Sequence, residues 1–189
     1  MTSTYGDTTY LTCAETAKLA RAALKKAFPG VKFSVRSDGC IRISWIDGPT
    51  AASVDDVVKC YAGGRFDGNI DYAYNVSHWL LADGSAIVAR SEGTESQRSY
   101  HAPINNEAPA GATKVSFGAR FVFTERRISP ELRTKVVRQV CEDFGLSPLG
   151  FSVVAGYDGG SYVQGPCEVP QLGTDMSTYT HRELCKLAA

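Results

Sequence analysis

The chain has 189 residues, with 20 basic and 20 acidic side chains and a hydrophobic content of 43%. This composition is typical of a globular chain and excludes a disordered or strongly charged one. No apolar run approaches the roughly 20 residues that a membrane-spanning helix needs, and the first six residues lack the basic start and apolar core of a signal peptide. We therefore expect a cytoplasmic protein with no membrane partner.

The six cysteines show no C-x-x-C pair and no spacing typical of a zinc site. In a reducing cytosol they are expected to be free thiols, several of them packed as small core residues. Of the three histidines, only His181 stands at ligand spacing, four residues before Cys185, and two ligands make half of a zinc site. The sequence thus predicts no metal and no cofactor.

A helix followed by a hairpin is predicted for residues 12–45. Thr12 and Glu15 have the spacing of a capping box, and apolar residues recur at helical intervals down to Phe28. Alternating apolar and polar residues flank Asp38-Gly39, which indicates a two-residue hairpin turn. The helix is expected to cover the apolar face of the hairpin, so that a second cationic surface forms on the outer face from Lys32, Arg36 and Arg42.

The middle of the chain is predicted to contain a second helix, from Ser53 with Asp56 as its capping partner to about Tyr61, and a second hairpin around Asp83-Gly84. Residues 91–113 are rich in Ser, Glu, Asn, Pro and Gly without an apolar period, so a long loop is expected. Residues 115–124 alternate as one long strand, whose aromatic side chains are expected to face the core rather than to form a platform for bases.

The last third begins with a predicted helix. Its start is indicated by Ser129, Pro130 and Glu131, and its end by Gly145. A hairpin around residues 158–160 and a terminal helix over residues 177–187 follow. These elements define an α+β fold in which antiparallel hairpins pack against helices, with two αββα-like units as a hypothesis. We expect one domain over residues 1–189, or two halves, 1–90 and 114–189, joined by the loop over residues 91–113.

Basic side chains are most concentrated in residues 114–138, which hold seven basic and two acidic residues on an otherwise neutral chain. Such a segment could contact nucleic-acid phosphates or an acidic protein surface, whereas a solvated helix face and strand rim would explain it without a ligand. The candidate binding residues are Lys114, Arg120, Arg126, Arg127, Arg133, Lys135 and Arg138.

Catalytic chemistry has weaker support in the sequence. Asp67 and Asp71 stand in a glycine-rich stretch, where paired carboxylates could hold a cation or act as acid and base, but turn formation explains the same residues. His101 lies in the predicted long loop, and Cys60 could meet a histidine in space. No phosphate-binding glycine motif, nucleophile elbow or deaminase signature is present. An enzyme with a His/Cys/Asp site therefore stays only as an alternative.

Several blocks of the sequence resemble one of the large polyvalent protein associated domains. They are residues 10–18, 22–36, 43–50, 64–71 and 115–123, so the resemblance spans roughly residues 10–128. These domains occur in proteins of phages and conjugative elements. The resemblance implies an accessory role on entry into a host, including counter-defence, and implies no catalytic residue.

The function expected from these observations is that of a non-catalytic accessory protein of a mobile genetic element, which acts by binding a macromolecule. A protein complex of the host or the element is the expected partner, and an inhibitor of anti-CRISPR or anti-restriction type is a specific form of this hypothesis. A nucleic-acid-binding protein that uses residues 114–138 is the main alternative.

Overall fold

The computed structural model describes residues 3–5, 7–68, 70–91 and 104–187. Its chain divides into two compact units. Unit 1 consists of residues 1–43 and 54–124, and unit 2 consists of residues 44–53 and 125–189. Both contain helices and antiparallel strands, so the α+β fold class is confirmed.

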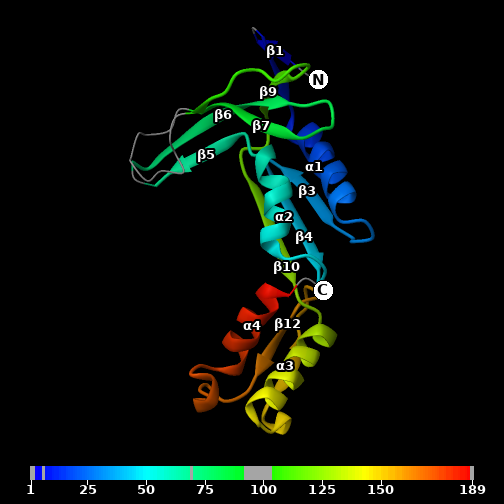
Figure 1. Cartoon of the computed structure of the whole chain (residues 1–189), viewed down its shortest axis with the longest axis vertical. Helices are drawn as coiled ribbons and strands as arrows, with labels where there is room; N and C mark the ends of the chain where they lie inside the picture. The colour runs from blue at the N-terminus through cyan, green and yellow to red at the C-terminus, as the bar shows by residue number, and fades with distance from the viewer. Residues whose placement is uncertain (1–2, 6, 69, 92–103, 188–189) are drawn as a thin grey trace. The chain divides into compact units, whose positions relative to one another are not determined.

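A three-stranded sheet and two helices make up one layered part that lies mostly in unit 1 (Figure 1). The sheet has the order β10-β4-β3. Its strands are β3 (Ser34–Asp38), β4 (Cys40–Ile46) and β10 (Val122–Arg127), and the helices are α1 (Cys13–Ala27) and α2 (Ala51–Val58). The helix α1 packs against β3, and buried residues recur along α1 and α2 and on alternate positions of β4. The predicted hairpin around Asp38-Gly39 is thus confirmed, with Gly39 at a φ of 64°.

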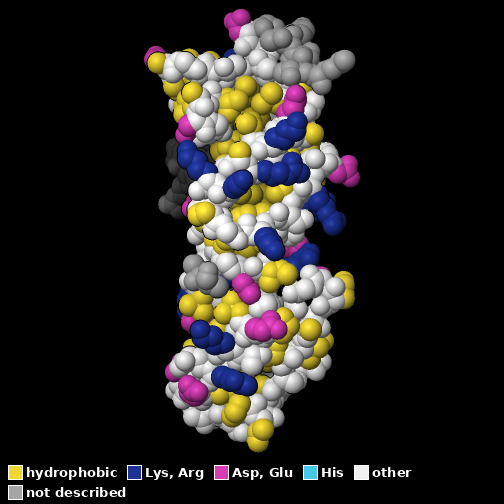
Figure 2. Space-filling model, turned by 90° about the vertical axis from the view of Figure 1, so that its right-hand side faces the viewer, with side chains coloured by type: hydrophobic (Ala, Val, Ile, Leu, Met, Phe, Trp, Pro, Cys, Tyr) yellow, Lys and Arg dark blue, Asp and Glu magenta, His cyan; other side chains and the backbone are white. Residues whose placement is uncertain are grey.

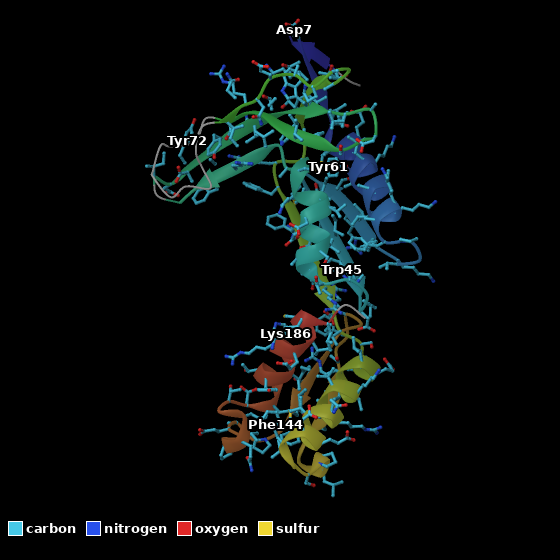
Figure 3. All side chains as sticks on the ribbon, in the orientation of Figure 1. Asp7, Trp45, Tyr61, Tyr72, Phe144 and Lys186 are labelled. Atoms are coloured by element: carbon cyan, nitrogen blue, oxygen red, sulfur yellow. The ribbon has the colours of Figure 1, made fainter. Side chains whose placement is uncertain are left out.

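Local hydrogen bonds explain where the two helices begin. The Thr12 hydroxyl accepts from the Glu15 amide, and the Glu15 carboxylate accepts from the Thr12 amide at 2.8 Å, which is the predicted capping box. For α2 the prediction was wrong by three residues, because the Ser53 amide donates to the Thr50 hydroxyl at 3.2 Å and the helix begins at Ala51. A 3-10 turn (Lys59–Tyr61) extends α2, and the Tyr61 hydroxyl donates to the Gly84 carbonyl at 2.8 Å (Figure 3).

The second part of unit 1 is a seven-stranded sheet with the order β1-β2-β9-β6-β7-β8, in which β5 also pairs with β6. The Asp83-Gly84 hairpin is confirmed, because Leu80 of β6 pairs with Ala86 of β7. The predicted loop over 91–113 is wrong in part, since a short strand at Ile104–Asn105 pairs with β7. The strands are β1 (Ser3–Tyr5), β2 (Thr8–Leu11), β5 (Gly64–Asp67), β6 (Tyr72–Leu80), β7 (Ala86–Ser91), β8 (Ile104–Asn105) and β9 (Thr113–Phe117).

The predicted single strand over residues 115–124 is wrong, because the chain leaves one sheet after Phe117 and enters the other at Val122. At this crossing the Gly118 amide donates to the Leu11 carbonyl at 2.6 Å, and the Gly63 amide donates to the Ala119 carbonyl at 2.8 Å. The backbone groups of Gly118 and Ala119 that make these bonds are no longer available to continue the ladder between β9 and β6. The alternation therefore restarts, and Phe123 is half exposed instead of buried.

Unit 2 contains the helices α3 (Pro130–Phe144) and α4 (Met176–Lys186) and the hairpin of β11 (Ser152–Ala155) and β12 (Ser161–Gln164). The Ser129 hydroxyl caps α3, and Gly145 ends it at a φ of 63°, as predicted. Two 3-10 turns, Pro148–Gly150 and Pro170–Leu172, connect the helices to the hairpin. The core forms between the helices and the hairpin from Ile128, Val136, Val137, Val140, Cys141, Val163, Met176 and Leu184. The order helix-strand-strand-helix thus occurs twice along the chain.

His78 is buried in the middle of β6, with its ring centroid 4.9 Å from that of Phe117. Among the described residues its Nδ1 has no hydrogen-bond partner. Burial, together with the charge of Arg65, lowers the pKa of His78 to about 4, and the backbone of Val76 acts in the opposite direction. The imidazole is therefore neutral in the folded protein at neutral pH.

We expect the protein to lose stability as the pH falls from about 6.5 to about 4, because the unfolded chain binds a proton at His78 in this range and the folded chain does not. The full linkage amounts to about 3 kcal/mol at most. Urea unfolding at several pH values measures it, and the His78→Phe variant should lose this part of the pH dependence. An identical pH profile for the variant and the wild type would contradict the assignment.

The backbone crossing makes a second prediction at Gly63. A Cβ atom there would lie 2.0 Å from the Phe117 carbonyl oxygen, so Gly63→Ala must displace backbone. We expect a loss of about 3 kcal/mol or more in the free energy of unfolding. Gly68→Ala is the matched control, since its Cβ would meet only the Phe66 ring at 3.8 Å. Equal stabilities of the two variants in urea titrations would show that the crossing tolerates a side chain.

Candidate binding surfaces

The seven predicted binding residues of the segment 114–138 do not all lie in one unit. Lys114 and Arg120 belong to unit 1, and the other five belong to unit 2. Arg120, Lys135 and Arg138 are exposed, and Lys114 is half-buried with its ammonium 5.9 Å from the centre of the Trp79 ring. The proposal that these exposed side chains bind a partner stays a prediction. Three arginines of the segment have other contacts.

Arg126 is a structural residue of unit 2. Its guanidinium donates to three backbone carbonyls, those of Asp47 at 3.2 Å, Gly48 at 3.0 Å and Leu184 at 2.8 Å. Burial lowers its pKa, and the nearby charge of Asp47 partly offsets this effect. The side chain thus holds the turn after β4 and the end of α4 and is not free to bind a partner.

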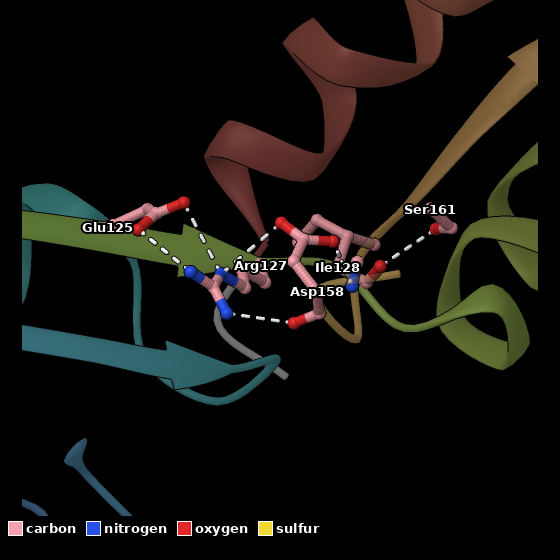
Figure 4. A network of polar contacts seen from close by, with 6 residues as sticks. Glu125, Arg127, Ile128, Asp158 and Ser161 are labelled. Atoms are coloured by element: carbon pink, nitrogen blue, oxygen red, sulfur yellow. Dashed lines mark hydrogen bonds and ion pairs between the residues drawn. The ribbon is translucent and has the colours of Figure 1, made fainter. Parts of the chain in front are cut away.

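Arg127, the residue after Arg126, takes part in a polar network (Figure 4). Its guanidinium contacts the Glu125 carboxylate at 3.1 Å and donates to the Asp158 carbonyl at 2.8 Å. The hydrogen bonds to Glu125 raise the pKa of Arg127. In the same network the Ser161 hydroxyl donates to the Ile128 carbonyl at 2.7 Å. Since Arg127 sits between two acidic residues, it adds little to any basic surface.

Arg133 is 6% exposed, although it stands in a basic stretch of the sequence. Its Nε donates to the Ser161 hydroxyl at 3.0 Å, and burial lowers its pKa. A binding surface or a solvated helix face would leave the basic residues of 114–138 exposed, whereas Arg133 is buried and Arg126 is partly buried. The physical reason is that long guanidinium side chains satisfy buried carbonyl and hydroxyl groups while their stems pack in the interior.

A different cationic surface is found on the three-stranded sheet of unit 1. One face of β4 is buried at Ile41 and Ile43, and the opposite face carries Arg42. The Arg42 guanidinium lies 5.6 Å from the centre of the Phe123 ring, which is 51% exposed. Arg36 of β3 is exposed and alternates with the half-buried Val35. Of the second cationic surface predicted at Lys32, Arg36 and Arg42, the last two are thus exposed as expected, whereas Lys32, also exposed, lines a groove beside α1.

Phe121 and Phe123 join this surface, and the sequence had assigned them to the core. Their ring centroids lie 6.1 Å apart, and the exposed Arg120 places its guanidinium 5.6 Å from the centre of the Phe121 ring. The signal that could have found them is Gly118, which allows the chain to change sheets and so restarts the alternation. We call the group formed by Arg36, Arg42, Arg120, Phe121 and Phe123 the sheet-face surface.

The outer side of α1 forms a second basic area, on the other side of this layered part of unit 1. Lys18, Arg21 and Lys25 recur at helical spacing and are exposed, as is Lys26. Figure 2 shows this side of the molecule, where Lys and Arg side chains gather over α1 and the neighbouring hairpin. Residues 15–42 contain seven basic and two acidic residues, the same balance as the segment 114–138.

Those candidate catalytic residues that the structure describes are not brought into one site. Asp67 is completely buried at the end of β5, whereas Asp71 is exposed at a φ of 50° in the turn before β6, which fits the turn interpretation. His78 is in the sheet core, and His101 lies outside the described residues. Cys60 is half-buried beside α2, and burial raises the pKa of its thiol.

His181 and Cys185 do meet on α4, with Nε2 and Sγ 3.7 Å apart on its exposed side. Across residues 3–5, 7–68, 70–91 and 104–187, no three His, Cys, Asp or Glu side chains lie close enough together to hold a metal ion. This pair therefore remains two potential ligands without a third.

The placement of Arg126 leads to a stability prediction. We expect Arg126→Met to lower the free energy of unfolding by about 2 kcal/mol or more, because three carbonyl acceptors lose a charged donor. Lys135→Met is the matched control on the exposed side of α3 and should change stability by no more than about 0.5 kcal/mol. Thermal unfolding followed by circular dichroism measures both. A control as destabilised as Arg126→Met would refute the structural role.

Residues 11–129 match the family described as large polyvalent protein associated domain 29, which agrees with the resemblance noted from the sequence. No curated protein and no solved structure matches the chain. Within the part of the chain that the structure describes, no helix is long and apolar enough to cross a membrane. Since the match covers more than half of the chain, this protein belongs to the large polyvalent protein associated domain 29 family and is associated with phages and other mobile genetic elements.

Proposed function

We propose that this protein is a non-catalytic binding protein of a mobile element and that it binds single-stranded nucleic acid on the sheet-face surface. The observation that supports this proposal is the half-exposed Phe123 ring with the Arg42 guanidinium 5.6 Å from its centre. Exposed aromatic rings on a sheet stack with unpaired bases, and guanidinium planes stack with bases or pair with phosphates.

The distribution of charge on the surface fits this ligand. Arg36, Arg42 and Arg120 come from β3, β4 and the segment before β10, and the guanidinium groups of Arg42 and Arg120 lie beside the rings of Phe123 and Phe121. Neighbouring strands are about 4.8 Å apart, which places such cations within reach of the phosphates next to a stacked base. In a duplex the bases are already stacked on one another, so exposed aromatic rings favour single strands, whose bases are free to stack on them.

Counter-defence is the finer role that the family setting suggests. A protein that covers single strands would withhold them from host nucleases or guide-RNA complexes, and such a role would be of anti-CRISPR or anti-restriction type. It would need only contact area, cations and stacking, all of which the sheet-face surface offers. Capture of a host protein complex remains a separate prediction.

Fluorescence anisotropy with labelled oligo(dT) tests the proposal. We expect Phe123→Ala to weaken binding by about 1–3 kcal/mol, the usual contribution of one stacked base. We expect Arg42→Gln to make the salt dependence shallower, by about 0.7 in the slope of log K against log salt, because one phosphate contact is lost. Melting temperatures should stay close to that of the wild type, since both side chains are exposed.

Tyr162→Ala is the control, because Tyr162 is an aromatic residue of similar exposure on a strand of unit 2. It should bind oligo(dT) like the wild type. Binding that does not respond to salt, or an equal loss of affinity in the Phe123 and Tyr162 variants, would exclude the sheet-face surface as the site.

A further inference from the structure

A groove of about 450 Å³ lies beside the C-terminal half of α1, on unit 1. Side chains of α1 form one wall, and the segment that leads into β3 forms the other. Its apolar lining includes Leu24, which is 1% exposed, and the partly buried rings of Phe28 and Phe33. The groove does not share a lining residue with the sheet-face surface.

All ionisable residues that line the groove are basic. They are Arg21 and Lys25 on α1 and Lys32 on the opposite wall, and all three are exposed. An apolar floor between cationic rims is complementary to a ligand that carries an apolar group flanked by negative charges.

The geometry argues against the addition of a strand to β3, although β3 is at the edge of the sheet. The Arg21 guanidinium donates to the Val35 carbonyl at 2.7 Å, so one of the acceptors that an added strand would need is already occupied. Insertion of a side chain between α1 and the β3 segment requires no such acceptor.

The rings in the groove are less accessible to a base than Phe123. Phe28 and Phe33 are partly buried and lie against each other, with centroids 6.0 Å apart. A stacked base needs an exposed ring face, whereas partly buried rings with aliphatic neighbours accommodate an aliphatic or aromatic side chain.

We propose that this groove binds an acidic peptide segment of another protein, which inserts one large apolar side chain between α1 and the β3 segment. Arg21, Lys25 and Lys32 then pair with carboxylates on either side of this anchor. The site is independent of nucleic-acid binding on the sheet-face surface, and it would give the protein a second partner of different chemistry.

The test uses the full chain and a short fluorescent peptide in which a Phe-Leu pair is flanked by glutamates and aspartates. We expect Lys25→Glu with Lys32→Glu to weaken peptide binding roughly tenfold or more, because two attractions become repulsions. The control pair, Lys18→Glu with Lys26→Glu, makes the same change in charge on α1 outside the groove and should reduce binding by a much smaller factor. Thermal unfolding verifies that both double variants are folded.

A second peptide, in which alanines replace the Phe-Leu pair, tests the apolar anchor. It should bind roughly tenfold or more weakly, as expected for the loss of a buried apolar side chain. Equal affinity of the two peptides, equal effects of the two charge reversals, or no peptide binding at all would overturn the proposal. Competition by oligo(dT) that depends on Lys25 and Lys32 would assign the groove to nucleic acid instead.

Discussion

The backbone crossing at Gly63 and Gly64 is the constraint on which the two sheets of unit 1 depend. The amides of these glycines donate to the carbonyls of Ala119 and Arg120, and the space beside Gly63 is filled by the Phe117 carbonyl. The chain therefore has to leave the seven-stranded sheet at this point, since its backbone groups are used by a different partner. Everything that follows in β10, including the outward position of Phe123, is a consequence of this change of sheet.

The elements that could be predicted from the sequence are those fixed by residues close to one another in the chain. Thr12 with Glu15, Ser129 with its following proline, and the Asp-Gly turns each determine a boundary through hydrogen bonds within a few residues. Gly118 marks a point where a strand can break, but which sheet the chain enters after it could not be predicted in this way. The change of sheet depends on contacts with Leu11 and Gly63, which are distant in sequence, while the alternating pattern continues across it.

The candidate site was predicted in part: the exposed arginines of the hairpin were predicted correctly, and the buried arginines of residues 114–138 were not. Arg36 and Arg42 were placed on the outer face because alternation about a known turn determines the face of each residue. Arg126 and Arg133 were expected to be exposed from a count of charges in a segment, and such a count does not indicate which side chain meets an unpaired carbonyl. An arginine side chain can either bind a partner at the surface or donate to carbonyls in the interior, and its place in the fold determines which of the two it does.

A sheet covered by helices on one side necessarily leaves two outer surfaces, the open side of the sheet and the outer side of the helices. In unit 1 both carry cations, on a chain whose net charge is zero. Two acidic ligands could then occupy opposite sides without touching, and each would neutralise part of the field that attracts the other. The two surfaces are separated by the thickness of a sheet and a helix, roughly 20 Å, which is about twice the Debye length at physiological ionic strength. Any coupling between the two ligands would therefore be weak, so the two proposed binding surfaces would work almost independently.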